Sequence, residues 1–314
     1  MHNRNQKQII ICLVVLVATV GVTADVSIAA SNGGRTAADF LRIGLGARAA
    51  GLGGAFTAVS EGAVASYWNP AGLSSLESKQ ILLSHFAWYQ DIDLEHGSFA
   101  LPLSEKLVVA TSITYLNYGK IDGYDINGVP TGELTAYDWT GGLSVGIGLN
   151  DQFSVGVSAK YIGQRLDIYD ASAFAFDFGV KYRFQRVILA AVATNIGSEM
   201  KFDQVSEKLP AAVRVGLAAT PFDNSLIAAI EFEKQVYGGE ILRQGIELGF
   251  DDRYFLRTGF DQLVNGSASS FASGLSVGAG VRLSIAQFDY AYTPRDKSIS
   301  EDLHRFSVIF NFGR

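Results

Sequence analysis

The sequence has very little cysteine: Cys12, near the amino terminus, is the only one in 314 residues. A scaffold held by disulfide bonds is therefore excluded. Long apolar runs are also scarce, because only one approaches the ~20 residues that a membrane-spanning helix needs. A membrane protein built from many helices is excluded on that ground. Charged residues make up only 18% of the chain, the formal net charge is −6, and 48% of the residues are hydrophobic. That combination excludes intrinsic disorder.

The one long apolar run has the features of an export signal. Arg4 and Lys7 precede an uncharged, mostly apolar stretch over 9–23, and small residues follow it up to Ala24. This order is typical of a cleaved secretory signal peptide, with Ala30 as a second choice for its end. A single membrane anchor is the alternative interpretation, but a run of about 15 residues is shorter than a spanning helix.

After the signal, apolar residues recur at every second position from Ile81 onward, which is the period of a half-buried strand. In one such segment Phe174, Phe176 and Phe178 alternate with Ala175 and Asp177. The sequence contains fourteen segments of this kind, at 81–90, 93–103, 106–118, 134–149, 152–166, 172–184, 187–196, 211–220, 226–236, 240–250, 253–261, 273–284, 287–293 and 304–312. The strand content is therefore far above the 20–25% of ordinary globular domains.

The connections between these segments differ systematically in length. Tight turns occur near 104–105, 150–151, 185–186, 251–252 and 285–286, whereas 119–133, 197–210, 262–272 and 294–303 are long. Short turns on one side and long loops on the other are typical of outer-membrane β-barrels. The faces opposite the apolar residues are mostly Gly, Ser, Ala and Thr, which suits a barrel interior better than a solvated surface. We therefore predict a closed antiparallel outer-membrane β-barrel of about 14 strands, with a soluble sandwich or propeller as the alternative.

The segment before the strands does not alternate. Residues 31–79 are rich in Gly and Ala, and Ser60-Glu61 could cap a short helix through Ala65 that stops before Pro70. A segment of about 50 residues with this many small side chains can pack closely inside a barrel. We predict that it forms an N-terminal hatch in the lumen; a periplasmic extension is the alternative. The predicted division is a signal peptide over 1–24, a hatch over 25–79 and a transmembrane barrel over 80–314.

Two runs in this segment carry a family resemblance. The run from Gly46 to Phe56 reads GARAAGLGGAF, and the run from Ser66 to Leu73 reads SYWNPAGL. Together they resemble the N-terminal region of PorV/PorQ-type proteins, which are similar to the FadL family of outer-membrane transporters for hydrophobic compounds. The resemblance implies a fourteen-stranded barrel closed by a hatch. It points to hatch or gate residues at Gly51, Gly53, Phe56, Trp68, Asn69 and Pro70.

The resemblance also implies two functions. The first is passage or binding of lipophilic small molecules by a barrel in the outer membrane of a Gram-negative-type bacterium. The second is a role in type IX secretion, where PorV-like members handle cargo proteins. A structural barrel without transport is a third reading. The loops reach only about 15 residues, which differs from the long-loop members of both groups. The expected partners are outer-membrane lipid and either lipophilic molecules or secretion components, with no nucleic acid.

Motifs that often carry chemistry have a different explanation here. Gly-x-Ser-x-Gly occurs around Ser144 and around Ser276, but both lie inside alternating strands and no helix follows to form a nucleophile elbow. None of the four histidines has the spacing of a metal ligand set. We therefore expect no catalytic, metal or cofactor site. If the protein is a transporter of lipophilic molecules, we expect an apolar pocket between hatch and wall near Phe56 and Trp68.

Charged residues on the small, polar faces are expected to point into the lumen. They are Lys160, Asp177, Lys181, Arg183, Arg214, Glu231, Glu233, Arg243, Glu247, Arg257 and Arg282. Unpaired charges in a packed lumen would be costly, so salt-bridge ladders between strands and hatch are one explanation. The functional alternative is a basic interior that attracts carboxylates, such as a fatty-acid head group.

Overall fold

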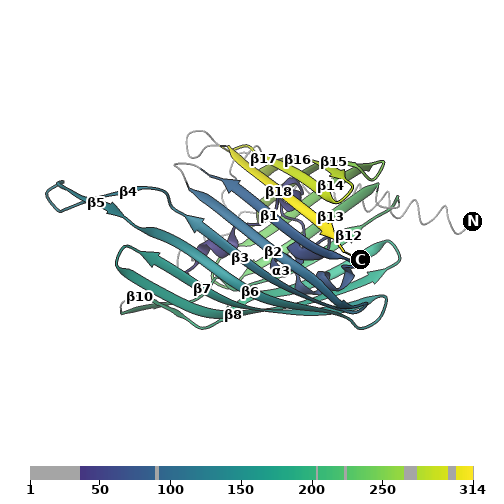
Figure 1. Ribbon diagram of the computed structural model, residues 1–314, viewed down its shortest axis with the longest axis horizontal. Helices are drawn as coiled ribbons and strands as arrows, with labels where there is room; N and C mark the ends of the chain where they lie inside the picture. The colour runs from purple at the N-terminus through teal and green to yellow at the C-terminus, as the bar shows by residue number, and fades with distance from the viewer. Residues whose placement is uncertain are drawn as a thin grey trace, which may run out of the picture.

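The computed structural model describes residues 36–88, 92–202, 204–222, 225–264, 274–295 and 302–313. The predicted signal peptide lies outside these residues. Fourteen strands form one closed antiparallel barrel in the order β1-β18-β17-β16-β15-β14-β13-β12-β9-β8-β7-β6-β3-β2 (Figure 1). The barrel strands are β1 (Lys79–Ala87), β2 (Asp93–Ser104), β3 (Leu107–Asn117), β6 (Ala136–Gly148), β7 (Phe153–Leu166), β8 (Tyr169–Phe184), β9 (Val187–Gly197), β12 (Ala212–Ala219), β13 (Leu226–Gln235), β14 (Glu240–Phe250), β15 (Tyr254–Leu263), β16 (Leu275–Leu283), β17 (Ala286–Thr293) and β18 (Leu303–Phe312). The predicted fold class is confirmed, and the strands coincide with the fourteen predicted segments to within a few residues.

The register explains the alternation in the sequence. In β8, Phe174, Phe176 and Phe178 are exposed on the outer wall at 60%, 45% and 54%, whereas Ala175 and Asp177 between them are fully buried. Adjacent strands repeat the arrangement, so the barrel presents an apolar outer surface and a small or polar inner one. That surface is the one a bilayer requires. Aromatic rings contact one another on the outer wall, as Trp139 does with Tyr161 at a centroid distance of 5.4 Å.

The two ends of the barrel differ. The first and last strands meet at the end of the tight turns, where Lys79 pairs with Phe312. The opposite end, called here the long-loop end, carries the two hairpins outside the barrel, β4 (Ile121–Tyr124) with β5 (Pro130–Leu134) and β10 (Met200–Phe202) with β11 (Val205–Glu207). The β4–β5 hairpin projects well beyond the barrel body (Figure 1). The alternation of loop lengths is incomplete, because a tight turn at Asp167, with φ +53°, joins β7 to β8 at the long-loop end.

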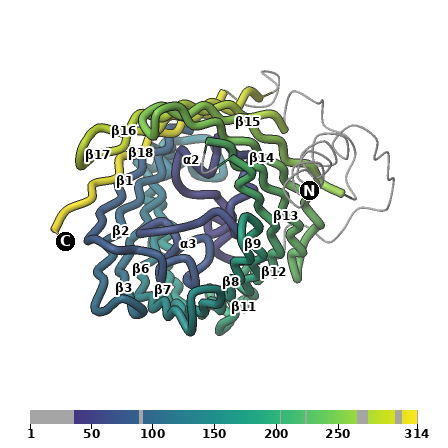
Figure 2. The backbone as a smooth tube through the Cα atoms, turned by 90° about the vertical axis from the view of Figure 1, so that its right-hand side faces the viewer, coloured from purple at the N-terminus to yellow at the C-terminus, as the bar shows by residue number. Residues whose placement is uncertain are grey.

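The segment over 36–76 lies inside the ring of strands (Figure 2). It consists of short helical turns, η1 (Asp39–Arg42), α2 (Ala47–Gly51), η2 (Gly62–Val64), α3 (Ala65–Trp68) and η3 (Pro70–Ser75). It begins at the long-loop end, where Ala37 N donates to Lys208 O at 3.0 Å, and reaches β1 at the other end. No helix among the described residues is long and apolar enough to cross a bilayer.

The helical turn after Ser60 differs in detail from its prediction. It stops before Pro70 as expected, but it continues past Ala65 to Trp68. Neither Ser60 nor Glu61 caps it, because Ser60 Oγ donates to Thr57 O at 3.2 Å and Glu61 makes no capping bond. Glu61 instead forms ion pairs with Lys181 and Arg183 of the barrel wall, as described below.

Candidate functional site

The hatch contacts the barrel wall at two sites where the wall residues are glycines. At the first site the wall backbone lies against α2 and the turn after it. A Cβ added at Gly259 would lie 2.0 Å from Gly53 N, and one at Gly278 would lie 3.1 Å from Gly51 Cα, so these positions leave little room for a side chain. Ser276 Oγ, between these wall positions, accepts a hydrogen bond from Gly53 N at 3.1 Å. The second Gly-x-Ser-x-Gly motif is thus part of the surface that holds the hatch, which we call the α2 seat.

The second site contacts Asn69 and Pro70, and we call it the η3 seat. A Cβ at Gly156 would lie 2.2 Å from Pro70 C, and one at Gly179 would lie 2.0 Å from Asn69 Oδ1. Asn69 is fully buried; its Oδ1 accepts from Ala71 N at 3.1 Å, and its amide donates to the wall carbonyl of Val180 at 3.2 Å. Asn69 and Pro70, two of the expected hatch residues, therefore form a turn that contacts the barrel wall.

The first Gly-x-Ser-x-Gly motif contributes to the η3 seat. Its serine, Ser144, shares a hydrogen bond with Ser158 at 2.7 Å, and Ser158 Oγ lies 3.3 Å from the hatch carbonyl of Ser66. A Cβ at Gly146 would come within 2.6 Å of Leu73 Cβ. Small residues at every second position therefore let hatch backbone approach wall backbone.

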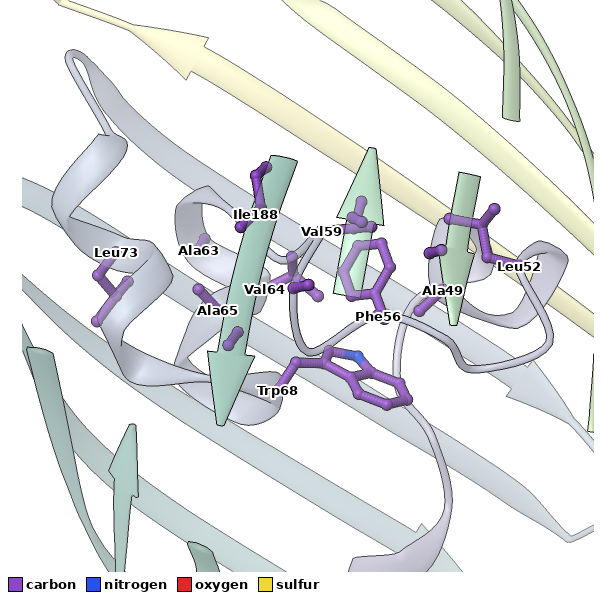
Figure 3. Packing of buried hydrophobic residues seen from close by; sticks show 14 of the residues in the cluster. Ala49, Leu52, Phe56, Val59, Ala63, Val64, Ala65, Trp68, Leu73 and Ile188 are labelled. Atoms are coloured by element: carbon purple, nitrogen blue, oxygen red, sulfur yellow. The ribbon is translucent and has the colours of Figure 1, made fainter. Parts of the chain in front are cut away.

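Between the two seats, Phe56 and Trp68 form the centre of an apolar cluster (Figure 3). Their rings meet edge to face at a centroid distance of 5.6 Å, and both side chains are nearly completely buried. Trp68 Nε1 donates to Leu45 O at 2.9 Å, so its polar atom is satisfied. Wall residues such as Ile188 complete the cluster from the strand side.

Ion pairs attach the hatch to the wall near the α2 seat. Arg48 makes two bonds of 2.8 Å to Glu247, whose Oε2 also accepts from Arg257 Nε at 2.5 Å. Arg257 continues to Asp289 at 2.7 Å. This chain of alternating charges is almost entirely buried, and each carboxylate has a guanidinium partner, as buried charges require.

A second group of charges holds the turn at Phe56. Glu231 Oε2 accepts from the backbone N–H groups of Phe56 and Thr57 at 3.1 and 2.7 Å. Arg243 Nη1 contacts Glu231 at 3.2 Å and Glu233 at 2.9 Å. Arg214 Nε completes the group with a 2.8 Å bond to Glu233.

A third group lies at the short-turn end. Glu61 of the hatch contacts Lys181 at 3.4 Å and Arg183 at 2.6 Å, and Lys181 Nζ also donates to Ser60 O at 2.9 Å. Burial opposes ionisation of Glu61, but these two cations together hold the pKa of its carboxyl below its usual 4.5. Elsewhere in the hatch, burial raises the pKa of Tyr67 to about 12.

The remaining predicted luminal charges occupy different places. Lys160 and Asp177 pair with each other at 2.8 Å on the inner wall. Arg183 and Arg282 are exposed at the short-turn rim, and Arg282 donates to Gln287 Oε1 at 2.8 Å. The predicted set was incomplete in acids and bases, because Asp138, Asp261, Asp289 and Arg305 also face inward. The alternation could have identified them, because a residue that follows or precedes an outward-facing residue such as Phe306 in a strand points inward.

A cavity of ≈ 240 Å³ lies between hatch and wall toward the long-loop end. Its aromatic lining is Tyr67, Trp68, Phe86 and Trp88. Its charged lining is Arg42, Arg214, Arg243, Arg295, Arg305 and Asp261. The prediction of an apolar pocket near Phe56 and Trp68 was therefore wrong in two respects: Phe56 is not part of the lining, and arginines form much of it.

The rest of the described chain offers little for metal or nucleophile chemistry. No group of three His, Cys, Asp or Glu side chains within the described ranges could hold a metal ion. The hydroxyl groups of Ser144 and Ser276 form the hydrogen bonds described above. The arrangement among the described residues is a packed lumen with a cavity toward the long-loop end, whose lining combines aromatic rings and guanidinium groups.

The fold resembles solved outer-membrane barrels. A Pseudomonas aeruginosa FadL homologue matches with a TM-score of 0.57 and 11% identity, covering 91% of this chain and 100% of its own. The Ralstonia pickettii toluene transporter TbuX gives 0.61 and 14%, and the P. putida toluene transporter TodX gives 0.60 and 13%; each match covers 86% of this chain and 99% of the other. At these identities the likeness concerns the fold.

The sequence comparison identifies the family. No curated protein matches the sequence. The family model described as type IX secretion system protein PorV matches residues 29–238, which is about two thirds of the chain and includes the hatch and both runs that carry the resemblance. The chain therefore belongs to the PorV family and is an outer-membrane β-barrel of the PorV and FadL type.

Proposed function

We propose that this protein binds hydrophobic small molecules at the long-loop end of the barrel and passes them inward when the hatch shifts. The observation that carries the proposal is the cavity beside Trp68, enclosed between hatch and wall. Small-molecule sites are usually concave and lined by aromatic side chains with a few polar groups; this cavity has the concave form and four aromatic side chains, with more charged groups than usual. The solved toluene transporters TbuX and TodX share the fold and support the same reading.

The proposed orientation follows from the two ends of the barrel. Long loops of outer-membrane barrels face the cell exterior and short turns face the periplasm. The cavity then opens on the exterior side of the hatch, and the Glu61 contacts lie on the periplasmic side. Export by a cleaved signal peptide ending between Ala24 and Ala30 completes this placement, and the outer membrane supplies the lipid around the outer wall.

In this proposal the hatch acts as the gate. Gly51 and Gly53 anchor it at the α2 seat, Asn69 and Pro70 anchor it at the η3 seat, and the Trp68 ring forms part of the cavity wall. No residue of the hatch lies on a continuous strand, so the turns between the seats can move without breaking the barrel. Phe56 acts in the apolar cluster rather than as cavity lining.

A filling substitution tests the proposal. Ile43 lines the cavity, so Ile43→Trp should occupy it, whereas Ile113→Trp adds the same ring to the outer wall, where Ile113 is 58% exposed. Uptake of radiolabelled toluene by cells expressing each form is the measurement. Wild type and Ile113→Trp should exceed the empty vector, and Ile43→Trp should fall to its level. Equal uptake by wild type and empty vector would contradict the proposal.

A second function has its own support. The family model carries the name of a type IX secretion protein, and the β4–β5 hairpin exposes Tyr124, Ile126 and Val129 at 61%, 101% and 55%. Exposed apolar side chains on a projecting hairpin suit contact with another protein. In a secretion role, deleting the gene abolishes surface display of cargo and the protein co-purifies with secretion components. Normal cargo display in the deletion strain argues against it.

A further inference from the structure

Arg305 differs from the other arginines around the cavity. Arg214 and Arg243 each bind a carboxylate within 3 Å, and Arg42 lies 3.5 Å from Asp39. Arg305 has no ion pair within the described part of the chain; its one hydrogen bond is a long contact of 3.5 Å from Nη1 to Thr293 Oγ1. Its Nε is buried and has no acceptor.

The free edge of Arg305 has a defined shape. Protein atoms cover Nε, so the donors left for a ligand lie on the terminal edge, where Nη1 makes only the long contact to Thr293 and Nη2 donates to none of the described residues. This edge is the one that carboxylates bind with both oxygens, in a planar fork that a point charge does not provide. The guanidinium of Arg305 lies 4.1 Å from the centroid of the Phe86 ring, which holds its plane in place.

Other unsatisfied atoms of the lining are also donors. Arg42 Nε and Arg214 Nη1 are buried without an acceptor, and Arg214 is only 5% exposed. Among the described residues that line the cavity, there is one carboxylate, Asp261, against five arginines. A ligand that satisfies this lining must therefore bring acceptors and negative charge rather than donors.

Beside the donors, the cavity has an aromatic wall. Phe86 and Trp88 stack at a centroid distance of 5.5 Å with an interplanar angle of 21°. Both line the cavity together with Trp68. Its volume of ≈ 240 Å³ is below the roughly 300–1,000 Å³ of typical ligand sites, which limits the apolar part of a ligand to a single ring or a short chain.

From these observations we infer that the cavity selects small aromatic carboxylic acids, with the carboxylate on the Nη1 and Nη2 edge of Arg305 and the ring against Phe86 and Trp88. This inference rests on the proposed function and narrows its substrate class. A neutral hydrocarbon offers no acceptor to the terminal edge of Arg305. A long-chain acid offers one, but its chain would extend beyond the cavity.

Calorimetric titration of the full-length, detergent-solubilised protein tests the inference, with sodium benzoate, toluene and sodium dodecanoate as probes. Arg305→Gln removes the charge, and Arg305→Lys keeps the charge but loses the planar edge. Arg282→Gln is the matched control, because Arg282 is an arginine of the barrel wall outside the cavity lining. Heat-modifiable migration on gels verifies that each variant forms the barrel.

Benzoate should bind wild type and Arg282→Gln equally, and more tightly than toluene or dodecanoate. Arg305→Gln should weaken benzoate binding by about tenfold to hundredfold, the range of a charge-assisted hydrogen bond, and leave toluene binding unchanged. Arg305→Lys should lie between. Toluene binding without benzoate binding overturns the inference and leaves the proposed function intact. Tighter binding of dodecanoate, or an unchanged benzoate affinity in a folded Arg305→Gln, also overturns it. If no probe binds wild type, both fail.

Discussion

The η3 seat gives the sharpest prediction, because a single methyl group at Gly156 collides with hatch backbone. The added Cβ would lie 2.2 Å from Pro70 C and 2.4 Å from Ala71 N. Since carbon atoms rest about 3.5–4.0 Å apart, one side must retreat by about 1.3 Å or more. Both obstacles are main-chain atoms and cannot rotate away. We expect Gly156→Ala to lift the hatch from its seat.

The magnitude follows from known costs of overpacking. Such substitutions cost about 1–3 kcal/mol in well-packed interiors, and contact with backbone favours the upper end. A cost of about 3 kcal/mol raises the population of unseated hatch about a hundredfold. Gly141 is the matched control, since it faces outward on the adjacent strand and its added Cβ would be 3.7 Å from Trp139. Gly141→Ala should be neutral or slightly stabilising.

Thiol labelling measures the unseated population. Ser66 is 3% exposed in the hatch, and Ser66→Cys is nearly isosteric, so a maleimide reaches the thiol only when the hatch opens. In this background Gly156→Ala should label about a hundredfold faster than Gly141→Ala. Equal labelling rates in two folded barrels would refute the reasoning, because the overlap would then be relieved without movement of the hatch.

Three further predictions concern the contacts that hold the hatch. Glu231→Gln keeps the shape but removes the charge between Phe56 and its arginine partner, so labelling at the same thiol should rise; an unchanged rate would show that the charge is dispensable. Asn69→Ala combined with Pro70→Ala should increase susceptibility to bulky antibiotics, and unchanged susceptibility counts against a plugging role. The folded pKa of Glu61 is depressed below 4.5, so its contribution is present above that value and disappears as the pH falls through the folded pKa. Wild type should therefore melt above Glu61→Gln at pH 7, with the difference closing well below pH 4.5; a difference independent of pH would contradict the pairing.

The strands could be predicted because each carries its own signal. A residue such as Phe176 is apolar because lipid lies beside it, and Asp177 is polar because the lumen lies on the other face. The period of two therefore records the environment residue by residue. The same register predicted which way the charges of β12–β15 point, and it would have identified Asp289 and Arg305 had it been applied to the last two strands.

The hatch and its partners could not be predicted in this way. Its helical turns have at most six residues, so no periodicity develops. The pairing of Arg48 with Glu247 joins positions 199 residues apart and depends on where the hatch lies in the lumen. For the same reason the cavity was expected to be apolar: Trp68 suggested an apolar lining, but the five arginines come from five separate segments, which are the hatch turn η1, the strands β12, β14 and β18, and the loop after β17. Contacts between residues so far apart in the sequence can be identified only from the three-dimensional structure.

The central claim is that the hatch seals the barrel at rest. Osmotic swelling of proteoliposomes tests it most directly, using protein whose barrel fold is verified by heat-modifiable migration and small sugars as solutes. Vesicles with wild-type protein should swell no faster than protein-free vesicles, whereas vesicles with Gly156→Ala should swell measurably faster. Porin-like swelling with the wild-type protein would contradict the account.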